Sequence, residues 1–417
     1  MFSPERSRLA PRRSRAPALH KTPQGFFVVC LFLVQAPAAI ASSADEQQFP
    51  DPFVEIDPVV EHHIGLGNMP GAVVLVGHKD AIVFHKAYGN RCIEPEVEAM
   101  TADTVFDLAS LTKVVATAPS VMLLVQRGRL KLDDKASKYL PAFGKAGKMN
   151  ITLRQLLVHY SGLPADLRKT RRRKVTSKNV LSRVYQTQLV APPGQRFIYS
   201  DLGFVVLGKV VEKVTGQSLA RFAQENLFSP LGMTSTGFLP RRETVSNVAP
   251  TERLKNDGML RGQVHDPLAA KLGGVAGDAG LFSTARDLAR FCQMLLQGGS
   301  LEGVQIFQPE IVAQMTSPQS PSGKPDIRGF GWDIQSTYSS VKGDFFSASS
   351  YGHTGYTGTS LWIDPEVQTF LVILTNRVHP DGKGSVKELR MELANIVGRV
   401  YRPAGTPTAE LTGHQQP

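Results

Sequence analysis

The sequence predicts an α+β fold in which both ends of the chain build one antiparallel sheet and helices are inserted between them. Strand-like segments occur near residues 72–87 and again after residue 280, whereas the residues between about 130 and 270 show helical spacing of their apolar side chains. The chain has 417 residues, 42% of them hydrophobic, which is enough for a large core in one domain or two coupled ones. We expect one domain at 55–403, with an α/β part at 55–128 and 270–403 and an α-helical part at 129–269.

The α/β part begins with a helix and a hairpin. Residues 57–69 have the spacing of a short amphipathic helix, and the strand-like residues 72–76 and 82–87 flank the turn His78-Lys79-Asp80. A helix that is apolar nearly all round, and therefore buried, starts at Ser110. Pro119 is expected to break or kink this helix after its second turn, because proline lacks a backbone donor and clashes with the preceding turn.

The remaining elements follow from periodicity and end signals. Gly216 should close one helix, Ser283 can cap another, and Asp364-Pro365 marks the turn between the last two strands. The expected helices are 151–159, 204–214, 284–297 and 386–401, and the expected strands are 330–334, 357–363 and 369–374. Residues 404–417 are predicted to be a tail.

The first 41 residues are predicted to be a secretory signal. Six lysines and arginines but one acidic residue precede the apolar run 26–34, and Ala39-Ile40-Ala41 fits a small-residue cleavage site. The run is short for a membrane span. We therefore expect a mature chain that starts with a lead-in at 42–54 and is periplasmic or secreted. Membrane association is expected only if the signal is not cleaved.

Much of the positive charge is concentrated in residues 168–174, which contain six lysines and arginines. A charge run of this kind is usually a solvated loop, and the alternative is attraction to an anionic partner such as an acidic envelope polymer or a lipid surface. No aromatic residue is interleaved within the cluster, so the pattern does not indicate nucleic-acid binding.

The cysteines and histidines indicate no metal or organic cofactor. No Cys/His cluster has the spacing of a zinc site. The mature chain keeps Cys92 and Cys292, and Cys292 shares a helix face with Leu288 and Leu295, which predicts burial. One disulfide could form in an oxidising compartment, but two unpaired cysteines are the default expectation.

Ser110-Leu111-Thr112-Lys113 places a serine and a lysine three residues apart at the start of the buried helix, so the lysine should project beside the serine hydroxyl. A second Ser-x-x-Lys, Ser339-Ser340-Val341-Lys342, lies in a run of Ser, Tyr, Gly and Lys that is typical of a surface loop or turn. The context therefore favours the first pair as the reactive one.

A serine hydroxyl needs a base beside it to act as a nucleophile at neutral pH. Lys113 can serve if burial near another cation lowers its pKa. Tyr199 can serve if Lys113 and a basic His353 stabilise its phenolate. The backbone amides of Ser110 and Tyr356 could form an oxyanion hole. Glycines at 355 and 358 would let a substrate lie close against the strand.

Three motifs resemble, in kind and order, those of the serine β-lactamase and penicillin-binding-protein superfamily. They are Ser110-x-x-Lys113, Tyr199-Ser200-Asp201 and His353-Thr354-Gly355. The tyrosine in the second motif resembles the class C branch, which also contains D-stereospecific peptidases and carboxylesterases. The resemblance covers about residues 55–400, and residues 262–266 and 273–283 look most like the esterase group of penicillin-binding protein 4B type. It implies the β-lactamase/DD-peptidase-like fold and catalytic roles for Ser110, Lys113, Tyr199 and His353.

Two residues depart from the class C pattern, which usually has asparagine at Asp201 and lysine at His353. A carboxylate cannot donate a hydrogen bond unless it is protonated, and a neutral histidine attracts anions weakly. Both changes favour ester or D-amino-acid peptide substrates over β-lactams, with Asp201, Thr354 and Gly355 as substrate-binding residues.

The leading interpretation is an exported serine hydrolase that forms an acyl-enzyme on Ser110. Its substrate would be a small acyl compound, namely an ester, a D-amino-acid peptide such as a cell-wall peptide, or a β-lactam. Carboxylesterase or D-Ala-D-Ala carboxypeptidase activity is favoured. A class C-like β-lactamase and a catalytically silent envelope-binding or scaffold protein remain the alternatives.

Overall fold

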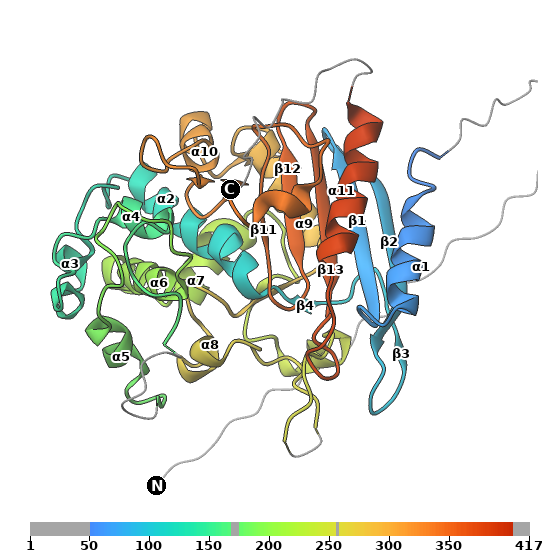
Figure 1. The fold of residues 1–417 in the computed structure, drawn as a ribbon, viewed down its shortest axis with the longest axis horizontal. Helices are drawn as coiled ribbons and strands as arrows, with labels where there is room; N and C mark the ends of the chain where they lie inside the picture. Colours follow the sequence, from blue (N-terminus) through green and yellow to red (C-terminus); the bar gives the residue numbers. More distant parts are fainter. Residues whose placement is uncertain (1–50, 168–174, 256–257, 403–417) are drawn as a thin grey trace, which may run out of the picture. The chain divides into compact units, whose positions relative to one another are not determined.

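A computed structural model describes residues 51–167, 175–255 and 258–402, which belong to one compact unit. The expected signal, the basic cluster 168–174 and the tail lie outside the described residues. The centre of the fold is an eight-stranded antiparallel sheet with the order β3-β2-β1-β13-β12-β11-β10-β9 (Figure 1). The predicted α+β fold, with one sheet built from both ends of the chain, is confirmed.

The central pairing joins the two ends of the chain. Strand β1 lies between its hairpin partner β2 and the last strand, β13, with Val73 opposite Leu374 and Val76 opposite Leu371. The strands of this sheet are β1 (Gly71–His78), β2 (Ala81–Cys92), β3 (Glu98–Ala99), β9 (Ile327–Arg328), β10 (Asp333–Gln335), β11 (Tyr351–Thr354), β12 (Ser360–Asp364) and β13 (Thr369–Thr375).

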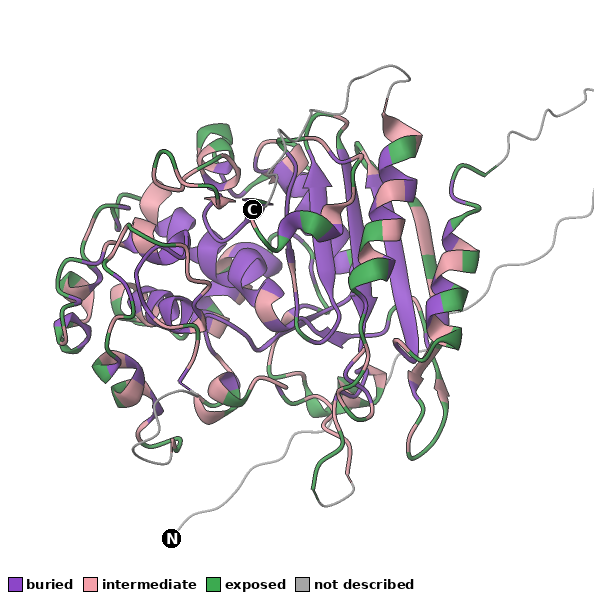
Figure 2. Cartoon of the chain, in the orientation of Figure 1, coloured by how far each residue is buried: buried purple, intermediate pink, exposed green. Residues whose placement is uncertain are grey.

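Helices cover both faces of the sheet. The first and last helices, α1 (Ile56–Gly65) and α11 (Lys387–Tyr401), lie side by side on one face, and α9 (Ala285–Leu296) packs on the other (Figure 1). Because successive side chains of a strand point to opposite faces, Val74 joins the cluster under α1 and α11 while Val73 joins the cluster under α9. The central strands are buried throughout, as Figure 2 shows.

The helical part packs beside the α9 face of the sheet. Its helices are α2 (Ala118–Gln126), α3 (Ala136–Tyr139), α4 (Leu153–Leu157), α5 (Val180–Gln186), α6 (Asp201–Thr215), α7 (Leu219–Ala223), α8 (Pro267–Lys271) and α10 (Pro309–Thr316). A small sheet with the order β4-β6-β5 joins the two parts, and a separate hairpin follows α9. These strands are β4 (Phe106–Asp107), β5 (Gly237–Phe238), β6 (Leu281–Ser283), β7 (Ser300–Leu301) and β8 (Val304–Gln305).

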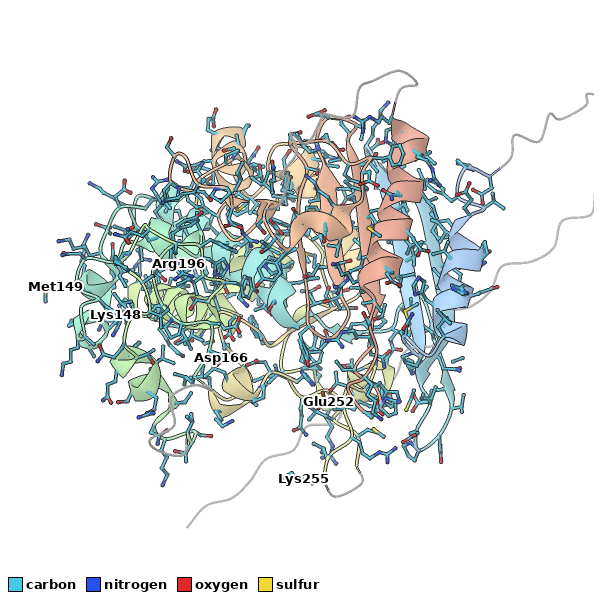
Figure 3. The ribbon with its side chains drawn as sticks, viewed as in Figure 1. Lys148, Met149, Asp166, Arg196, Glu252 and Lys255 are labelled. Atoms are coloured by element: carbon cyan, nitrogen blue, oxygen red, sulfur yellow. The ribbon has the colours of Figure 1, made fainter. Side chains whose placement is uncertain are left out.

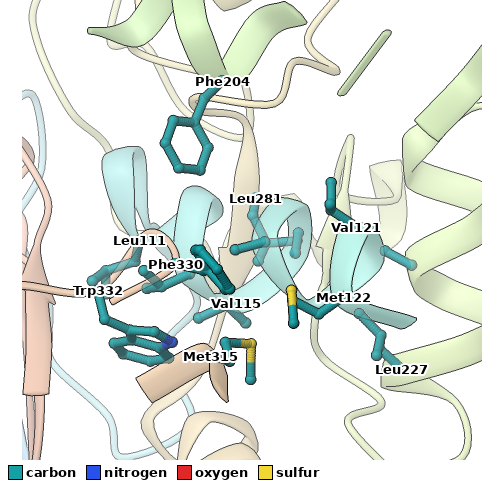
Figure 4. Close-up of a cluster of buried hydrophobic side chains, with 14 of the residues drawn as sticks. Leu111, Val115, Val121, Met122, Phe204, Leu227, Leu281, Met315, Phe330 and Trp332 are labelled. Carbon is teal, nitrogen blue, oxygen red and sulfur yellow. The ribbon is translucent and has the colours of Figure 1, made fainter. Parts of the chain in front are cut away.

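The segment that contains Ser110 contributes many residues to the largest cluster of buried hydrophobic side chains. It consists of a 3₁₀ turn (Ala109–Leu111), a π turn (Lys113–Thr117) and α2, and 83% of this apolar stretch is buried inside the fold. Pro119 lies in the first turn of α2, where no backbone donor is needed. The irregularity therefore precedes the proline, whereas the sequence placed the break after the second turn. Figure 4 shows Val115 and Met122 of this segment among the aromatic and aliphatic side chains around it.

Several element boundaries differ from those expected. Thr284 caps α9 by accepting the Asp287 N–H, while Ser283 belongs to β6. Strand β10 begins only at Asp333, and β12 begins at Ser360 because residues 355–359 form the turn between β11 and β12, closed by the Gly355 N–H donating to the Thr359 carbonyl at 2.7 Å. Strand β11 was missing from the expected strands. Cys92 and Cys292 are both buried free thiols, the default expectation.

Candidate active site

The Ser110 turn is held in an unusual backbone conformation. Ala109 has a φ of +46°, which costs an L-residue roughly 1–2 kcal/mol. The Asp107 carboxylate accepts the Ala109 N–H at 2.9 Å, and the Ala109 carbonyl accepts the Thr112 hydroxyl at 2.7 Å. These two hydrogen bonds stabilise the turn that presents the Ser110 side chain to the pocket.

Lys113 is completely buried, and three hydrogen bonds hold its ammonium group. Nζ lies 3.0 Å from Ser110 Oγ, 2.9 Å from the Asp278 carbonyl oxygen and 2.8 Å from Asp201 Oδ1. An ammonium group has three N–H donors, so all three are engaged. The expected proximity of Lys113 to the Ser110 hydroxyl is present.

The charge state of Lys113 differs from the expectation. Burial lowers the pKa of its amine, but the negative charge of Asp201 and the hydrogen bond to its carboxylate reverse this and leave the pKa above its ordinary value. A lowered pKa of Lys113 would need a neighbouring cation, and a carboxylate lies there instead. Lys113 is therefore an ammonium group in the resting site, and the condition under which it would act directly as a base is not met there.

Tyr199 lies between the lysine and a histidine. Its ring stacks on His159 at 4.4 Å, and Lys113 Nζ is 5.2 Å from the ring centroid. Burial raises the pKa of Tyr199, and Asp201 raises it further, while Lys113 and the hydrogen bond to Ser110 lower it. The net effect is a pKa above the usual value. Tyr199 is a phenol in the resting site, and the expected stabilised phenolate is absent there.

His159 orients the tyrosine motif, a role that the sequence analysis did not assign to it. Its backbone φ is +61°, and its Nδ1 accepts the backbone N–H of Ser200 at 3.0 Å. Burial, with Arg328 and Lys113 nearby, lowers the pKa of His159 well below its usual value, so the ring is neutral. The signal for this role was the position of His159 just after the capped helix α4, at a sharp change of chain direction.

His353 also lies close to Tyr199, with the two ring centroids 5.8 Å apart. Its Nδ1 lies 2.8 Å from the Thr354 carbonyl, which can only accept, so Nδ1 carries the proton and Nε2 does not. Nε2 is buried without a hydrogen-bond partner. Burial, Arg328 and Lys113 lower the pKa of His353 well below its usual value. A basic His353, the condition under which it would stabilise a Tyr199 phenolate, is therefore not present in the resting site.

The two amides expected to form an oxyanion hole come from segments that are tied together. The Thr357 hydroxyl donates to the Asp107 carbonyl at 2.7 Å, and the Thr359 hydroxyl donates to the Leu108 carbonyl at 3.0 Å. Among the described residues, no acceptor engages the backbone N–H of Ser110 or Tyr356. Both N–H groups are thus available to a substrate oxygen.

The two glycines of this hairpin have an internal role. A Cβ on Gly355 would lie 2.1 Å from the Thr359 hydroxyl and 2.5 Å from the Leu108 carbonyl, and one on Gly358 would lie 2.1 Å from the Thr375 hydroxyl. The absent side chains therefore allow the hairpin to approach the neighbouring strands. The sequence analysis attributed the glycines to the approach of substrate, which this packing does not require.

Arg377 and Arg390, which were not predicted as site residues, also line the pocket and are called the arginine wall below. The Arg390 guanidinium donates to the carbonyls of Gly355 and Thr359, and its buried Nε has no partner. Arg377 stacks over the Tyr356 ring at 4.5 Å. No carboxylate of the described residues lies within 4 Å of either guanidinium group, although Arg328 has Asp333 at 3.4 Å. Arg377 and Arg390 thus bring positive charge to the pocket that no carboxylate in the described part of the chain neutralises by direct contact.

These residues surround one cavity of about 610 Å³. It is lined by Ser110, Tyr199, Asp201, His353, Thr354, Gly355, Tyr356 and the three arginines, with Lys113 behind Ser110. On the rim, His265 stacks on Tyr356 and lies 3.0 Å from Glu252, which is labelled in Figure 3. The structure thus brings together all the site residues named from sequence.

Comparison with known proteins gives consistent results. The model of the family described as Beta-lactamase matches residues 56–396. An Escherichia coli (strain K12) protein named "Putative D-alanyl-D-alanine carboxypeptidase" is 34% identical over 362 residues, which cover 78% of this chain and 82% of that protein. A Salmonella typhimurium protein of the same name is 33% identical, with 85% and 89% covered.

Two solved structures illustrate the similarity of fold. "EstCE1, a hydrolase with promiscuous acyltransferase activity" superimposes with a TM-score of 0.69 and 24% identity, covering 84% of this chain and 98% of that one. A class C β-lactamase from Rhodobacter sphaeroides superimposes with a TM-score of 0.65 and 20% identity, covering 83% and 99%. At these identities the superpositions show a shared fold.

Proposed function

Because this chain belongs to the β-lactamase family and is a serine hydrolase of that superfamily, we propose that it is an exported carboxypeptidase that forms an acyl-enzyme on Ser110. Its substrates would be D-amino-acid peptides that end in a free carboxylate. Ser110 is the nucleophile, Lys113 and Tyr199 transfer protons, and neutral His353 helps to hold the Tyr199 ring. The amides of Ser110 and Tyr356 stabilise the oxyanion.

The arginine wall is the observation that favours a carboxylate-bearing substrate. Arg377 and Arg390 line the pocket, Arg377 over the Tyr356 ring and Arg390 hydrogen-bonded to the Gly355 carbonyl, without a carboxylate partner among the described residues. A guanidinium group binds a carboxylate through charge-assisted hydrogen bonds worth roughly 1.5–3 kcal/mol. The leaving residue of a peptide would lie beside the oxyanion amide, which places its carboxylate near this wall. The carboxypeptidase name of the 34%-identical relative supports the same substrate class.

The test compares an N-acylated peptide ending in D-Ala-D-Ala with the same peptide as its C-terminal amide. The wild-type protein should hydrolyse the free acid with the lower KM, and Arg377→Met should raise that KM about tenfold or more without changing the KM for the amide. Arg399→Met is the matched control, since Arg399 of α11 is ion-paired with Glu55 and does not line the pocket. Equal KM values for acid and amide in the wild type would contradict carboxylate recognition.

An ester substrate is the second candidate, because the neutral His353 leaves the position of the usual third-motif lysine uncharged. Turnover of a p-nitrophenyl ester with no turnover of either peptide would select it. A chromogenic cephalosporin in the same series separates both from a β-lactamase. A protein that turns over none of these substrates and that no active-serine probe labels would be a binding or scaffold protein instead.

A further inference from the structure

The hydrogen bonds of Lys113 leave its nitrogen unable to accept a proton. Its three N–H groups point to Ser110 Oγ, the Asp278 carbonyl and Asp201 Oδ1 at 2.8–3.0 Å. A protonated amine has no lone pair, so it cannot remove the Ser110 proton until it loses one of its own. One of these three acceptors must therefore take a proton before Ser110 can be activated by Lys113.

Asp201 is the acceptor suited to this step. Ser110 is the group that has to lose its own proton, and a peptide carbonyl such as that of Asp278 is a very weak base. The Asp201 carboxylate, in the first turn of α6, is the strongest base of the three acceptors, because a carboxylate oxygen binds a proton more readily than a hydroxyl or a peptide carbonyl does. Its side chain is 28% exposed and lines the pocket.

The other ionisable groups around Lys113 are poor bases. Burial raises the pKa of the Asp278 side chain well above its usual value, so this acid is protonated. His159 and His353, whose rings both lie close to Tyr199, have pKa values well below the usual one because both are buried. Tyr199 is a phenol with a raised pKa. Asp201 is therefore the carboxylate available to Lys113 among the described residues.

We propose that Asp201 is a catalytic residue that accepts a proton from Lys113 as Lys113 takes the proton of Ser110. The inference rests on the proposed acyl-enzyme function. It gives a carboxylate at this position a task that an amide could not perform, because an amide can accept the hydrogen bond but not the proton. Burial of the pair helps, since moving the proton neutralises two charges in a poorly solvated place.

The transfer balances at each step. The Ser110 oxygen bonds to the substrate carbonyl carbon, its proton moves to Nζ of Lys113, and Nζ passes a proton to Asp201 Oδ1. The carbonyl oxygen takes the negative charge and faces the amides of Ser110 and Tyr356. When the intermediate collapses, the bond to the leaving group breaks and the leaving group takes the Tyr199 hydroxyl proton. Lys113 replaces that proton, and Asp201 returns its own to Lys113.

The experiment measures how fast a fluorophosphonate probe labels Ser110, by mass spectrometry from pH 6 to pH 10, in wild-type protein and Asp201→Asn. We expect the labelling rate at pH 7.5 to fall about a hundredfold, with an unchanged melting temperature, and Asp201→Glu to recover part of the rate. Asp287→Asn is the matched control. Asp287 is a buried carboxylate that accepts hydrogen bonds from Ser235 and Thr236 away from the pocket, so its variant should label at the wild-type rate.

The opposite result has a clear physical meaning. If Asp201 only keeps Lys113 charged, removing it lowers the pKa of Lys113, and Asp201→Asn should label as fast as the wild type or faster at pH 7.5. That outcome would overturn the proposal. Wild-type labelling at Ser110 without hydrolysis of the D-Ala-D-Ala peptide would contradict the proposed carboxypeptidase and leave the Asp201 comparison decisive. No labelling of Ser110 in the wild type would overturn both.

Discussion

The molecule contains two Ser-x-x-Lys segments in similar local structure, at Ser110–Lys113 and Ser339–Lys342. Each serine lies in a 3₁₀ turn. In each case a side chain three residues before the serine accepts the backbone N–H of the residue just before it: Asp107 accepts from Ala109, and Ser336 accepts from Tyr338. The two turns share this hydrogen bond but differ in backbone conformation at the residue before the serine, where φ is +46° at Ala109 and −97° at Tyr338.

The lysines nevertheless have different partners. Lys113 reaches its own serine, whereas Lys342 donates to the carbonyls of Ile334 and Ser347 at 3.1 and 3.3 Å, and the Ser339 hydroxyl donates to Ser336. Burial lowers the pKa of Lys342, although Asp333 and Asp364 act in the opposite direction. Asp201 raises the pKa of Lys113. Residues distant in the sequence, rather than the motif spacing, decide which segment can catalyse.

Replacing the serine of each segment by alanine, in two separate variants, should produce the largest difference in activity between the segments. Ser110→Ala should lower kcat/KM for the D-Ala-D-Ala peptide by about 10⁴-fold or more, because the nucleophile is lost while binding remains. Ser339→Ala should stay within about threefold of the wild type, since it removes one turn hydrogen bond. Comparable losses in both variants would mean that the two segments do not differ in function.

Replacing the lysines should give the next largest difference. Lys113→Met should lower kcat about 10³-fold, because Ser110 then loses its proton acceptor and Asp201 its partner. Lys342→Met should keep kcat within about threefold and change the free energy of unfolding by no more than about 2 kcal/mol, for two hydrogen bonds. Steady-state kinetics and urea unfolding measure the two effects. A large loss of kcat in Lys342→Met with an intact fold would contradict the assignment.

Each segment also has a tyrosine nearby. Tyr199→Phe should lower kcat about a hundredfold, because the hydroxyl that protonates the leaving group is lost while the stacking on His159 remains. Tyr338 lies 5.6 Å from the Tyr199 ring on the pocket wall. Tyr338→Phe should change kcat less than twofold, since the ring is kept and its hydroxyl has no assigned proton transfer.

The smallest expected difference concerns the side chains that hold the turns. Burial raises the pKa of Asp107 from its ordinary 3.8 to about 6. Between about pH 4 and pH 6 the native state therefore binds a proton that the unfolded state does not, and this group's contribution to stability falls as pH rises. The difference in unfolding free energy between wild type and Asp107→Asn should fall by on the order of 2 kcal/mol from pH 4 to pH 7.

The turn held by the uncharged Ser336 side chain supplies the control for that measurement. Ser336→Ala should show no change with pH in its difference from the wild type, because no charge is removed. Urea unfolding at fixed ionic strength compares the two variants. If the difference in unfolding free energy between the wild type and Asp107→Asn does not change with pH, the Asp107 carboxyl does not titrate in this range.

Elements with a strong local pattern could be predicted from the sequence. The hairpin of β1 and β2, helix α6 with its cap at Gly216 and helix α11 all lie close to their expected positions. Strand β11 could not be found in this way, because Tyr351-Gly352-His353-Thr354 lacks apolar alternation and becomes a strand only by pairing with β12.

The same limit applies within the site. Ser110, Lys113, Tyr199 and His353 could be named as candidate site residues because each lies in a short motif, and the structure brings them together around one pocket. The charge of Lys113 could not be derived, since it depends on Asp201 lying at 2.8 Å and on how deeply the lysine is buried. Arg377 and Arg390 were missed because nothing in their local sequence marks them, and only the packing of the hairpin against α11 brings Arg390 to Gly355.

The pairing of β1 with β13 has a consequence for how the protein is made. A chain that leaves the ribosome from its N-terminus can form the β1–β2 hairpin early, but β1 cannot be paired on its other side until residue 375 has been synthesised. Until then the apolar segment 109–126 lacks the C-terminal strands and the residues from 327 onward that cover it. We therefore expect a nascent chain to be inactive and prone to aggregate until the segment from residue 327 onward, about the last fifth of the protein, has been synthesised.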